Sequence, residues 1–423
     1  MKVVVVGGGL AGLAAALELV DAGHPASLLE ARPTLGGAVQ TLPERDGDPS
    51  PPPDNGQHIA LGCFTAYRAF LARIGQAGAV RRLPLALPVI APDGRTAAIA
   101  PGVGGLLRYR HLSLADRLAV ARVMRTLARL NPVEHDDETF AALLRRLGQS
   151  ESVIERFWDV FMRPALNLPS AEASAALALF TVQTALLADR EASDVVLPAA
   201  PLGWMHGEAA AAALARRGAV VRTRARVTAL AEDAAILADG ERVAADAFVV
   251  AVPPSESALL LGEAEPRLGE SPIVSVHLLF DRLLLRAPLA ALLGSPAHWV
   301  FDRGRLTGHE PGRGQYLTVV ASGAPDLAAL RGRELVELVA SELTERLGRA
   351  ELIWSRVSRE PAATFAGRPG TARLRPGPRT ARENVVRAGA WTDTGWPATM
   401  ESAVRSGRRA ARLLAGTAAR VAA

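Results

Sequence analysis

Three glycines and one downstream acid have a spacing that predicts a specific chemistry. Gly7, Gly9 and Gly12 lie between two apolar runs, residues 2–6 and 13–20. In a strand–turn–helix unit, the first glycine permits a tight turn, the second lets a pyrophosphate approach the backbone, and the third allows the helix to pack closely on the strand. Glu30 follows after one helix and one strand, where a carboxylate binds the hydroxyls of a ribose. The pattern predicts a dinucleotide site for an adenosine without a 2′-phosphate. The competing interpretation is a glycine-rich turn with a chance acid, in a chain with 38 glycines.

Further phosphate contacts are predicted at the start of the helix and just after Glu30. The first turn of a helix offers free N–H groups and the positive end of its dipole to an anion. Arg32 would add charge, and Gly36-Gly37 would bring more backbone N–H groups to the same phosphates, unless this segment is an ordinary solvated turn. The predicted contact set comprises Gly7, Gly9, Leu10, Ala11, Gly12, Glu30, Ala31, Arg32, Gly36 and Gly37.

The elements that must position these residues form a βαβ unit. Residues 2–6 predict a buried strand, residues 13–20 a helix that ends at Gly23, and residues 26–30 a second strand. Residues 41–56 are rich in Pro, Asp and Gly and predict a loop. Residues 59–74 predict another helix.

The rest of the chain predicts a helical block followed by strands. Residues 80–200 look like a helical insertion, with a helix over 113–130 that Ser113 can cap, and further helices over 140–147, 153–162 and 171–187. Residues 218–252 predict short strands with a turn at Asp239-Gly240, and residues 272–280, 298–302 and 315–320 predict a second sheet. A helix is expected over 333–347, a strand at 385–386 and a final helix over 398–414.

Composition excludes several classes of protein. The chain has 423 residues, of which 49% are hydrophobic and 22% charged, so it can build full cores and is not disordered. Lys2 is the only lysine, the net charge is +5, and no basic run is interleaved with aromatic residues, so no nucleic-acid partner is expected. The single cysteine, Cys63, excludes an intrachain disulfide and a Cys-based zinc site; we expect no metal and a reducing, cytoplasmic location. The glycines and acids near the start argue against a signal peptide, and no stretch reaches the roughly 18 apolar residues of a membrane span.

Three segments carry a resemblance to a known superfamily. The run from Arg32 to Gly37 resembles the extended phosphate loop of the flavin-dependent amine oxidases and carotenoid desaturases. Residues 226–254 resemble its second dinucleotide-domain segment, which implies that Val227 meets the adenine and that residues 252–254 cross into the substrate domain; the alternative is a plain β-meander. Residues 388–403 resemble its closing flavin motif, which implies contacts from Gly389, Asp393, Thr399 and Met400. Many members have Gly-Asp where this chain has Gly389-Ala390.

This resemblance implies an α/β fold with non-covalent FAD, since Cys63 lies far in sequence from the closing motif. A Rossmann-type FAD domain is expected to comprise residues 1–80, 200–262 and 381–423. A substrate domain of mixed sheet plus helical insertion is expected to comprise residues 81–199 and 263–380. Amine oxidases that use oxygen often place a lysine–water pair at the flavin, and a chain whose only lysine is Lys2 does not fit that chemistry.

Residues 54–63, 157–167 and 391–401 are similar to the hydroxysqualene dehydroxylases of bacterial hopanoid and squalene synthesis. The resemblance implies that a hydroxyl group is replaced by hydrogen, through ionisation of an allylic alcohol and hydride delivery from reduced flavin N5. The departing hydroxyl needs a proton. His58 is the candidate acid, with Gln57 or Asp54 orienting it; the alternative is that Asp54 and His58 brace a loop.

Two other functions stay open, and both use the same fold. A carotenoid or phytoene desaturase would run the electrons in the opposite direction, from an alkene chain to oxidised flavin. A non-catalytic prenyl-lipid-binding protein would hold no flavin, and Glu30 and Gly36-Gly37 argue against it.

A C30 isoprenoid hardly dissolves in water, so we expect an apolar tunnel that opens toward lipid and a peripheral contact with the inner face of a membrane. Association with other enzymes of the squalene pathway is also expected. Five arginines are candidates to face anionic headgroups, unless they form a solvated basic face. They are Arg108, Arg110, Arg117, Arg122 and Arg125.

Overall fold

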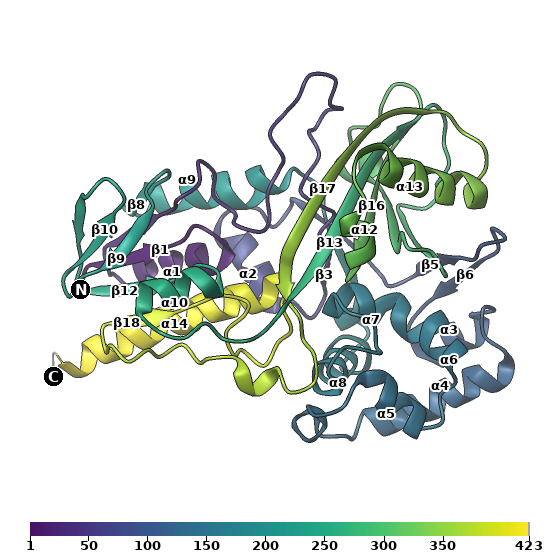
Figure 1. The fold of residues 1–423 in the computed structure, drawn as a ribbon, viewed down its shortest axis with the longest axis horizontal. Helices are drawn as coiled ribbons and strands as arrows, with labels where there is room; N and C mark the ends of the chain where they lie inside the picture. The colour runs from purple at the N-terminus through teal and green to yellow at the C-terminus, as the bar shows by residue number, and fades with distance from the viewer. Residues whose placement is uncertain (422–423) are drawn as a thin grey trace.

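The first strand of the chain lies in the middle of a sheet of five parallel strands. In the computed structural model, which describes residues 1–421, they lie in the order β18 (Val385–Arg387), β12 (Ala247–Val250), β1 (Val3–Val6), β2 (Ala26–Leu29) and β8 (Val220–Arg222) (Figure 1). All four residues of β1 are buried because both faces of this sheet are covered. Val3 and Val5 pack on the side of helices α1 (Leu10–Asp21) and α14 (Met400–Val421). Val4 and Val6 face a small antiparallel sheet of β9 (Val227–Leu230), β10 (Ala234–Leu237) and β11 (Arg242–Ala244).

A second, mixed sheet of seven strands forms the other half of the molecule (Figure 1). Its β14 and β5 pair in parallel, whereas its other neighbours are antiparallel. Helices α12 (Pro325–Ala329) and α13 (Gly332–Leu347) pack on it. The strand order is β17 (Leu352–Phe365), β13 (Glu270–Phe280), β16 (Gln315–Ser322), β15 (Trp299–Asp302), β14 (Leu289–Leu292), β5 (Leu87–Ile90) and β6 (Thr96–Ile99).

The helical layer is confirmed, but it begins about twenty residues later than expected. Residues 80–99 form strands β4 (Val80–Leu83), β5 and β6, because Gly94 turns β5 back onto β6 as a hairpin. Ser113 caps its helix as predicted, accepting the Asp116 N–H at 3.1 Å. The helices of this layer are α3 (Gly102–Arg108), α4 (Leu114–Leu127), α5 (Phe140–Arg146), α6 (Glu151–Val153), α7 (Asp159–Leu166) and α8 (Ala175–Thr181), with π-helical turns at Ile154–Trp158 and Val182–Leu187.

The predicted helix over 59–74 is wrong in its first third. Ala60 and Leu61 form β3, which pairs with β7 (Val195–Pro198), and helix α2 runs only from Thr65 to Arg73. A Cβ at Gly62 would lie 1.7 Å from the Glu191 carbonyl oxygen, so this backbone passes too close to its neighbour to admit a side chain. Strands β14 and β17 were also missed. Helix α13 is confirmed to within one residue, and the final helix α14 is confirmed but begins two residues and ends seven residues later than expected.

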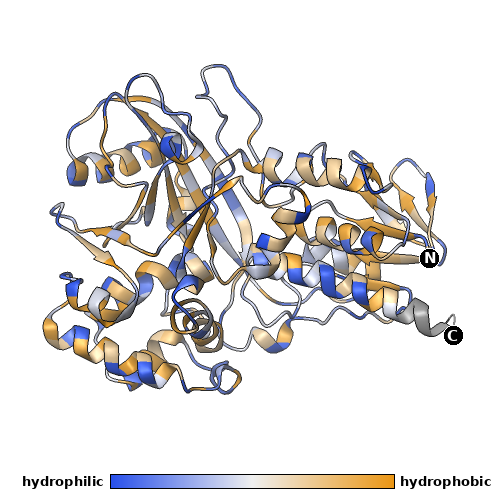
Figure 2. Ribbon diagram, turned by 180° about the vertical axis from the view of Figure 1, so that it is seen from behind, coloured by the Kyte–Doolittle hydropathy of each residue, from blue (hydrophilic) through white to orange (hydrophobic). Residues whose placement is uncertain are grey.

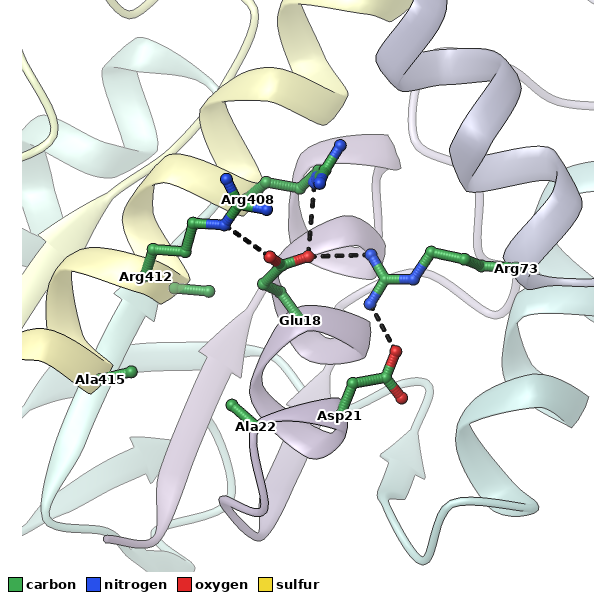
Figure 3. A pocket seen from close by; sticks show the side chains of 8 residues that line it. Glu18, Asp21, Ala22, Arg73, Arg408, Arg412 and Ala415 are labelled. Carbon is green, nitrogen blue, oxygen red and sulfur yellow. Dashed lines mark hydrogen bonds and ion pairs between the residues drawn. The ribbon is translucent and has the colours of Figure 1, made fainter.

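The last helix lies directly on the first, and this contact brings the two ends of the chain together. A Cβ at Gly407 would lie 2.0 Å from the Ala11 carbonyl oxygen, so α14 crosses the first turns of α1 at backbone distance. Beside the crossing, Glu18 of α1 binds Arg73 of α2 and Arg412 of α14 at 2.9 and 2.6 Å, lining a surface pocket of about 390 Å³ (Figure 3). Burial alone would raise the pKa of Glu18, but the arginine hydrogen bonds outweigh it and lower the pKa. These ion pairs hold α1, α2 and α14 together.

The strands of the parallel sheet are mostly apolar along their length, whereas apolar and hydrophilic residues alternate along the helices (Figure 2). Among residues 1–421, no helix combines the length and the apolar character needed to cross a bilayer.

Candidate functional site

In the opening turn, two of the three predicted glycines are required by close packing of the backbone, and the third is not. Gly7 has φ +103°, and a Cβ there would lie 2.4 Å from the Ala251 carbonyl oxygen. A Cβ at Gly12 would lie 1.9 Å from the Gly7 carbonyl oxygen. Gly9, in contrast, has ordinary extended backbone, and a Cβ there would meet only the Gly37 Cα, at 3.7 Å. The space above Gly9 is therefore open, as the predicted approach of a pyrophosphate requires.

Backbone donors border this open space. The Leu13 N–H donates to the Gly9 carbonyl at 2.9 Å and makes the first intrahelical bond of α1. The N–H groups of Leu10, Ala11 and Gly12 precede that bond, so the helix itself gives them no acceptor. A cradle of free donors beside a glycine with room above it fits the phosphates of a dinucleotide.

The second glycine pair lies against the same turn. The Gly36 N–H donates to the Gly8 carbonyl at 2.9 Å, and Gly36 forms a parallel bridge with Gly9. Gly37 has φ +62°, and a Cβ there would lie 2.8 Å from the Gly9 Cα. The doublet thus follows the opening turn at backbone distance, which is where the predicted phosphate loop needs it. The Arg32 side chain is exposed.

Glu30 is fixed across the turn at the end of β2. It is 9% exposed, and its carboxylate accepts the N–H groups of Gly8 at 2.6 Å and Arg32 at 2.7 Å. Each carboxylate oxygen retains a lone pair for a hydroxyl donor. The backbone oxygen of Glu30 accepts the Ala225 N–H at 2.8 Å, so the start of β9, with the buried Val227, lies beside it. The ribose and adenine contacts of Glu30, Ala31 and Val227 stay predictions.

The closing motif meets the end of β18 and the start of α14. Gly389 has φ +153°, its N–H donates to Ser406 Oγ at 2.9 Å, and a Cβ there would lie 2.4 Å from Trp391 Nε1. Helix α14 begins at Met400, two residues later than expected, and Thr399 Oγ accepts the Ser402 N–H at 3.2 Å. Asp393 is exposed and accepts the Gly395 N–H at 3.1 Å.

Sequence reasoning missed Arg375, which holds the closing motif from behind. Its buried guanidinium donates to the backbone oxygens of Ala390, Trp391 and Thr392 at 3.1, 3.3 and 2.5 Å and stacks over Phe365 at 4.8 Å. Burial lowers the pKa of Arg375 to about 10, so it stays charged at neutral pH. Nothing in the order of residues singles out this arginine among the many in the chain.

The predicted catalytic segment contains one residue that the structure places differently. Asp54 is 1% exposed, and its carboxylate binds Arg303 at 2.7 Å and accepts from Thr41 Oγ at 2.7 Å and the Leu202 N–H at 3.0 Å. Among the described residues it makes no hydrogen bond to His58. The expectation that Asp54 orients His58 is therefore not supported, and the bracing alternative is favoured for Asp54.

His58 itself contacts its own loop. Its Nδ1 lies 3.2 Å from the Gly56 carbonyl oxygen, and Gln57 Nε2 donates to the His58 carbonyl at 3.3 Å. Burial lowers the pKa of His58, partly offset by the Gly56 carbonyl and by the charge of Asp54. The imidazole is therefore mostly neutral at pH 7. Its role as an acid stays a prediction.

Two buried pairs near this segment were also missed. Tyr67 Oη lies 2.8 Å from His206 Nε2, and burial lowers the pKa of His206 to about 4, with the nearby His58 adding to the effect. Glu401 is fully buried and accepts the N–H groups of Ala66 and Tyr67 at 3.0 and 2.7 Å, so the acid of the closing motif caps helix α2.

The fold and the site define a class: an enzyme with a Rossmann-type domain that binds FAD and a second domain built on a mixed sheet. The comparisons with known proteins agree. Residues 10–415 match the family described as flavin containing amine oxidoreductase. The chain is 30% identical over 422 residues to a hydroxysqualene dehydroxylase of Sinorhizobium fredii, covering 97% of each chain. It is 25% identical to a probable zeta-carotene desaturase of Synechococcus elongatus, covering 98% of each.

Among solved structures, the putative protoporphyrinogen oxidase of an Exiguobacterium species shares the fold. Its TM-score is 0.71 at 17% identity, with 97% of this chain and 98% of that chain covered. The chain therefore belongs to the flavin-containing amine oxidoreductase family, within which it groups with the hydroxysqualene dehydroxylases. It is an oxidoreductase, and FAD is the cofactor that the residues of the opening turn fit.

Proposed function

We propose that the protein removes the hydroxyl group of hydroxysqualene and puts hydrogen in its place, giving squalene and water. The observation that carries the proposal is the 30% identity to a hydroxysqualene dehydroxylase over 97% of both chains, which runs through both domains rather than the nucleotide site alone. FAD, when bound in its reduced form, supplies the hydride of this reaction.

The residues of the second domain suit a cationic reaction on an apolar chain. The buried core that joins this domain to the closing motif contains the aromatic side chains of Phe157, Trp158, Trp299 and Trp391. An aromatic face that a bound substrate reaches would attract the positive charge that develops on an allylic carbon when its hydroxyl leaves. Trp391 also donates to the Val252 carbonyl at 3.1 Å, which ties the aromatic core to the crossover from the FAD domain.

The departing hydroxyl takes up one proton, and His58 is the candidate donor. The lowered pKa of the half-buried His58 makes its charged form scarce at neutral pH, and a scarce but strong acid transfers its proton readily once formed. Gln57 Nε2, bonded to the His58 carbonyl, would hold the backbone of this segment in place. Membrane contact, a cytoplasmic location and association with other squalene-pathway enzymes are parts of the same proposal.

The test is an anaerobic incubation of the reduced holoenzyme with hydroxysqualene, followed by analysis for squalene. Squalene formed in proportion to flavin oxidised supports the proposal. The 25% identity to a zeta-carotene desaturase favours a carotenoid desaturase as the second candidate. Dehydrogenation of phytoene or zeta-carotene by the oxidised holoenzyme, with hydroxysqualene left unchanged by the reduced one, would establish that candidate instead.

A further inference from the structure

Four large aliphatic side chains are exposed close together in sequence on two adjoining helices. Val103 and Leu107 of α3 are 62% and 44% exposed, and Leu114 and Leu118 of α4 are 60% and 54% exposed. In each helix the two residues are four apart and so share one face. The other exposed large hydrophobic residues of the described chain are spread singly over its remaining length. We call these four residues the apolar quartet.

The neighbouring backbone fixes the quartet in the exposed position. The opposite face of α4 packs Val120, Val123 and Leu127 into the core, so α4 has no freedom to turn its leucines inward. Arg117 donates to the carbonyl oxygens of Leu107 at 2.7 Å and Leu112 at 2.9 and 2.7 Å, which clamps the end of α3 to α4. Arg117, one of the five arginines expected to face lipid, is therefore a brace for the quartet.

The four other arginines form a basic rim around the quartet. Arg122 and Arg125 continue the exposed face of α4, while Arg108 and Arg110 lie where α3 ends. All four are exposed, and none forms an ion pair with a described residue. The only acid between residues 100 and 130 is Asp116, whose carboxylate accepts from Ser113 Oγ at 2.6 Å. The surface therefore combines exposed apolar area with uncompensated positive charge.

The apolar core beneath this surface extends to the flavin motif. Tyr109 and Leu112, which follow α3, belong to the same continuous cluster of buried side chains as Trp391 of the closing motif. Ile59, next to His58, packs on this cluster. In the ribbon views, α3 and α4 lie at the end of the molecule opposite the two termini (Figures 1 and 2).

We propose that the apolar quartet and its basic rim dock the protein on an anionic lipid bilayer, and that the isoprenoid substrate enters from the membrane at this end. Exposed aliphatic side chains of this kind enter the boundary between headgroups and acyl chains, and guanidinium groups pair with lipid phosphates. The docking is inferred from this surface alone, whereas the entry of substrate at this end rests on the proposed function.

Sedimentation with vesicles tests the docking. The holoenzyme is expected to bind vesicles of phosphatidylcholine and phosphatidylglycerol about tenfold more tightly than vesicles of phosphatidylcholine alone. The double variant Leu107→Ser/Leu118→Ser should lower the binding at least about tenfold, since it removes apolar area from the interface. The matched control, Leu259→Ser/Leu283→Ser, changes two leucines that are 83% and 62% exposed elsewhere and should bind as the unmodified protein does.

Charge and substrate entry are tested separately. The double variant Arg122→Gln/Arg125→Gln tests the charge. It should bind anionic vesicles about tenfold more weakly than the unmodified protein and should keep the same weak binding to neutral vesicles. The Leu107→Ser/Leu118→Ser variant, called the quartet variant, should convert hydroxysqualene in detergent micelles at the normal rate but lose most of its rate with vesicle-borne hydroxysqualene. Binding that is absent, or that both leucine pairs reduce equally, overturns the docking; a normal rate of the quartet variant on vesicles overturns entry at this end. Docking without squalene formation in either assay would count against the proposed function alone.

Discussion

The variant Gly9→Val tests whether Gly9 is needed for binding FAD rather than for folding. The backbone at Gly9 is extended, with φ −76° and ψ 176°, and a Cβ there meets nothing closer than the Gly37 Cα at 3.7 Å. A Cβ added at Gly9 therefore makes only an ordinary van der Waals contact within the protein. Gly9 is the N-cap of α1, where valine is less favourable than glycine, so we expect the free energy of unfolding of the flavin-free protein to fall by only about 1 kcal/mol.

The effect on FAD should be much larger. Valine methyl groups would fill the space between the turn and the phosphates, and each charge-assisted hydrogen bond lost there costs about 1.5–3 kcal/mol. One or two such bonds correspond to about 10- to 1,000-fold weaker binding, since 1.4 kcal/mol is a factor of ten. The assay is the ratio of flavin to protein absorbance after purification, followed by titration of the stripped protein with FAD.

Two matched variants complete the experiment. Gly78→Val adds the same side chain at a position where nothing lies within 4 Å, and it should keep its flavin. Gly12→Ala places a Cβ 1.9 Å from the Gly7 carbonyl oxygen, so it should lose about 1–3 kcal/mol of stability as well as flavin. A fully flavinated Gly9→Val protein would refute the assignment of the opening turn to a pyrophosphate.

Three further predictions concern the polar groups behind the site. Asp54→Asn leaves Arg303 buried without its counter-charge and should cost about 3–5 kcal/mol in a denaturant titration, while Asp54→Asn/Arg303→Met should recover much of that loss; equal stability of all three proteins would contradict the bracing role. If His58 donates the proton, its lowered pKa means that the charged form grows as pH falls, so kcat/KM should rise from pH 8 to pH 5 and His58→Gln should flatten the profile; a variant with an unchanged profile would exclude His58 as the acid. Arg375→Met removes three bonds to the backbone oxygens of residues 390–392 and should lower both flavin retention and the melting temperature of the holoenzyme, whereas Arg349→Met on the surface should change neither.

The nucleotide half of the molecule was predictable because its signals are local. The first thirty residues contain a strand, a glycine turn, a helix and a second strand in succession. Each glycine permits a close backbone contact with a residue that lies nearby in the chain or in the next strand. The parallel order β12-β1-β2 then places the later segments beside the first. Even here, Gly12 lies inside α1, because its missing side chain serves packing and not the end of a turn.

The second sheet was predicted only in part because its longest strand lacks the apolar alternation of a half-buried strand. Strand β17 carries Arg356 and Ser358 among its buried residues and contains Pro361. Arg356 is buried because it pairs with Asp48 and donates to the Pro43 carbonyl, both in the loop that the composition of residues 41–56 predicts. Local hydropathy has no means of showing that a polar strand is covered by a polar loop.

The same loop explains why the sequence could suggest His58 as the candidate acid but could not show which residue orients its side chain. Two of its carboxylates, those of Asp48 and Asp54, pair with Arg356 of β17 and with Arg303, which directly follows β15; both arginines are distant in sequence. A carboxylate four positions before a histidine suggests an orienting pair when only the sequence is read. In the folded protein the carboxylate is used to join the loop to the other domain, and His58 is left with the backbone of Gly56. The position of the segment that carries the candidate acid is thus set by buried ion pairs between the domains. If His58 is the acid, a change that breaks one of these pairs should disturb catalysis without touching any residue that meets the flavin or the substrate.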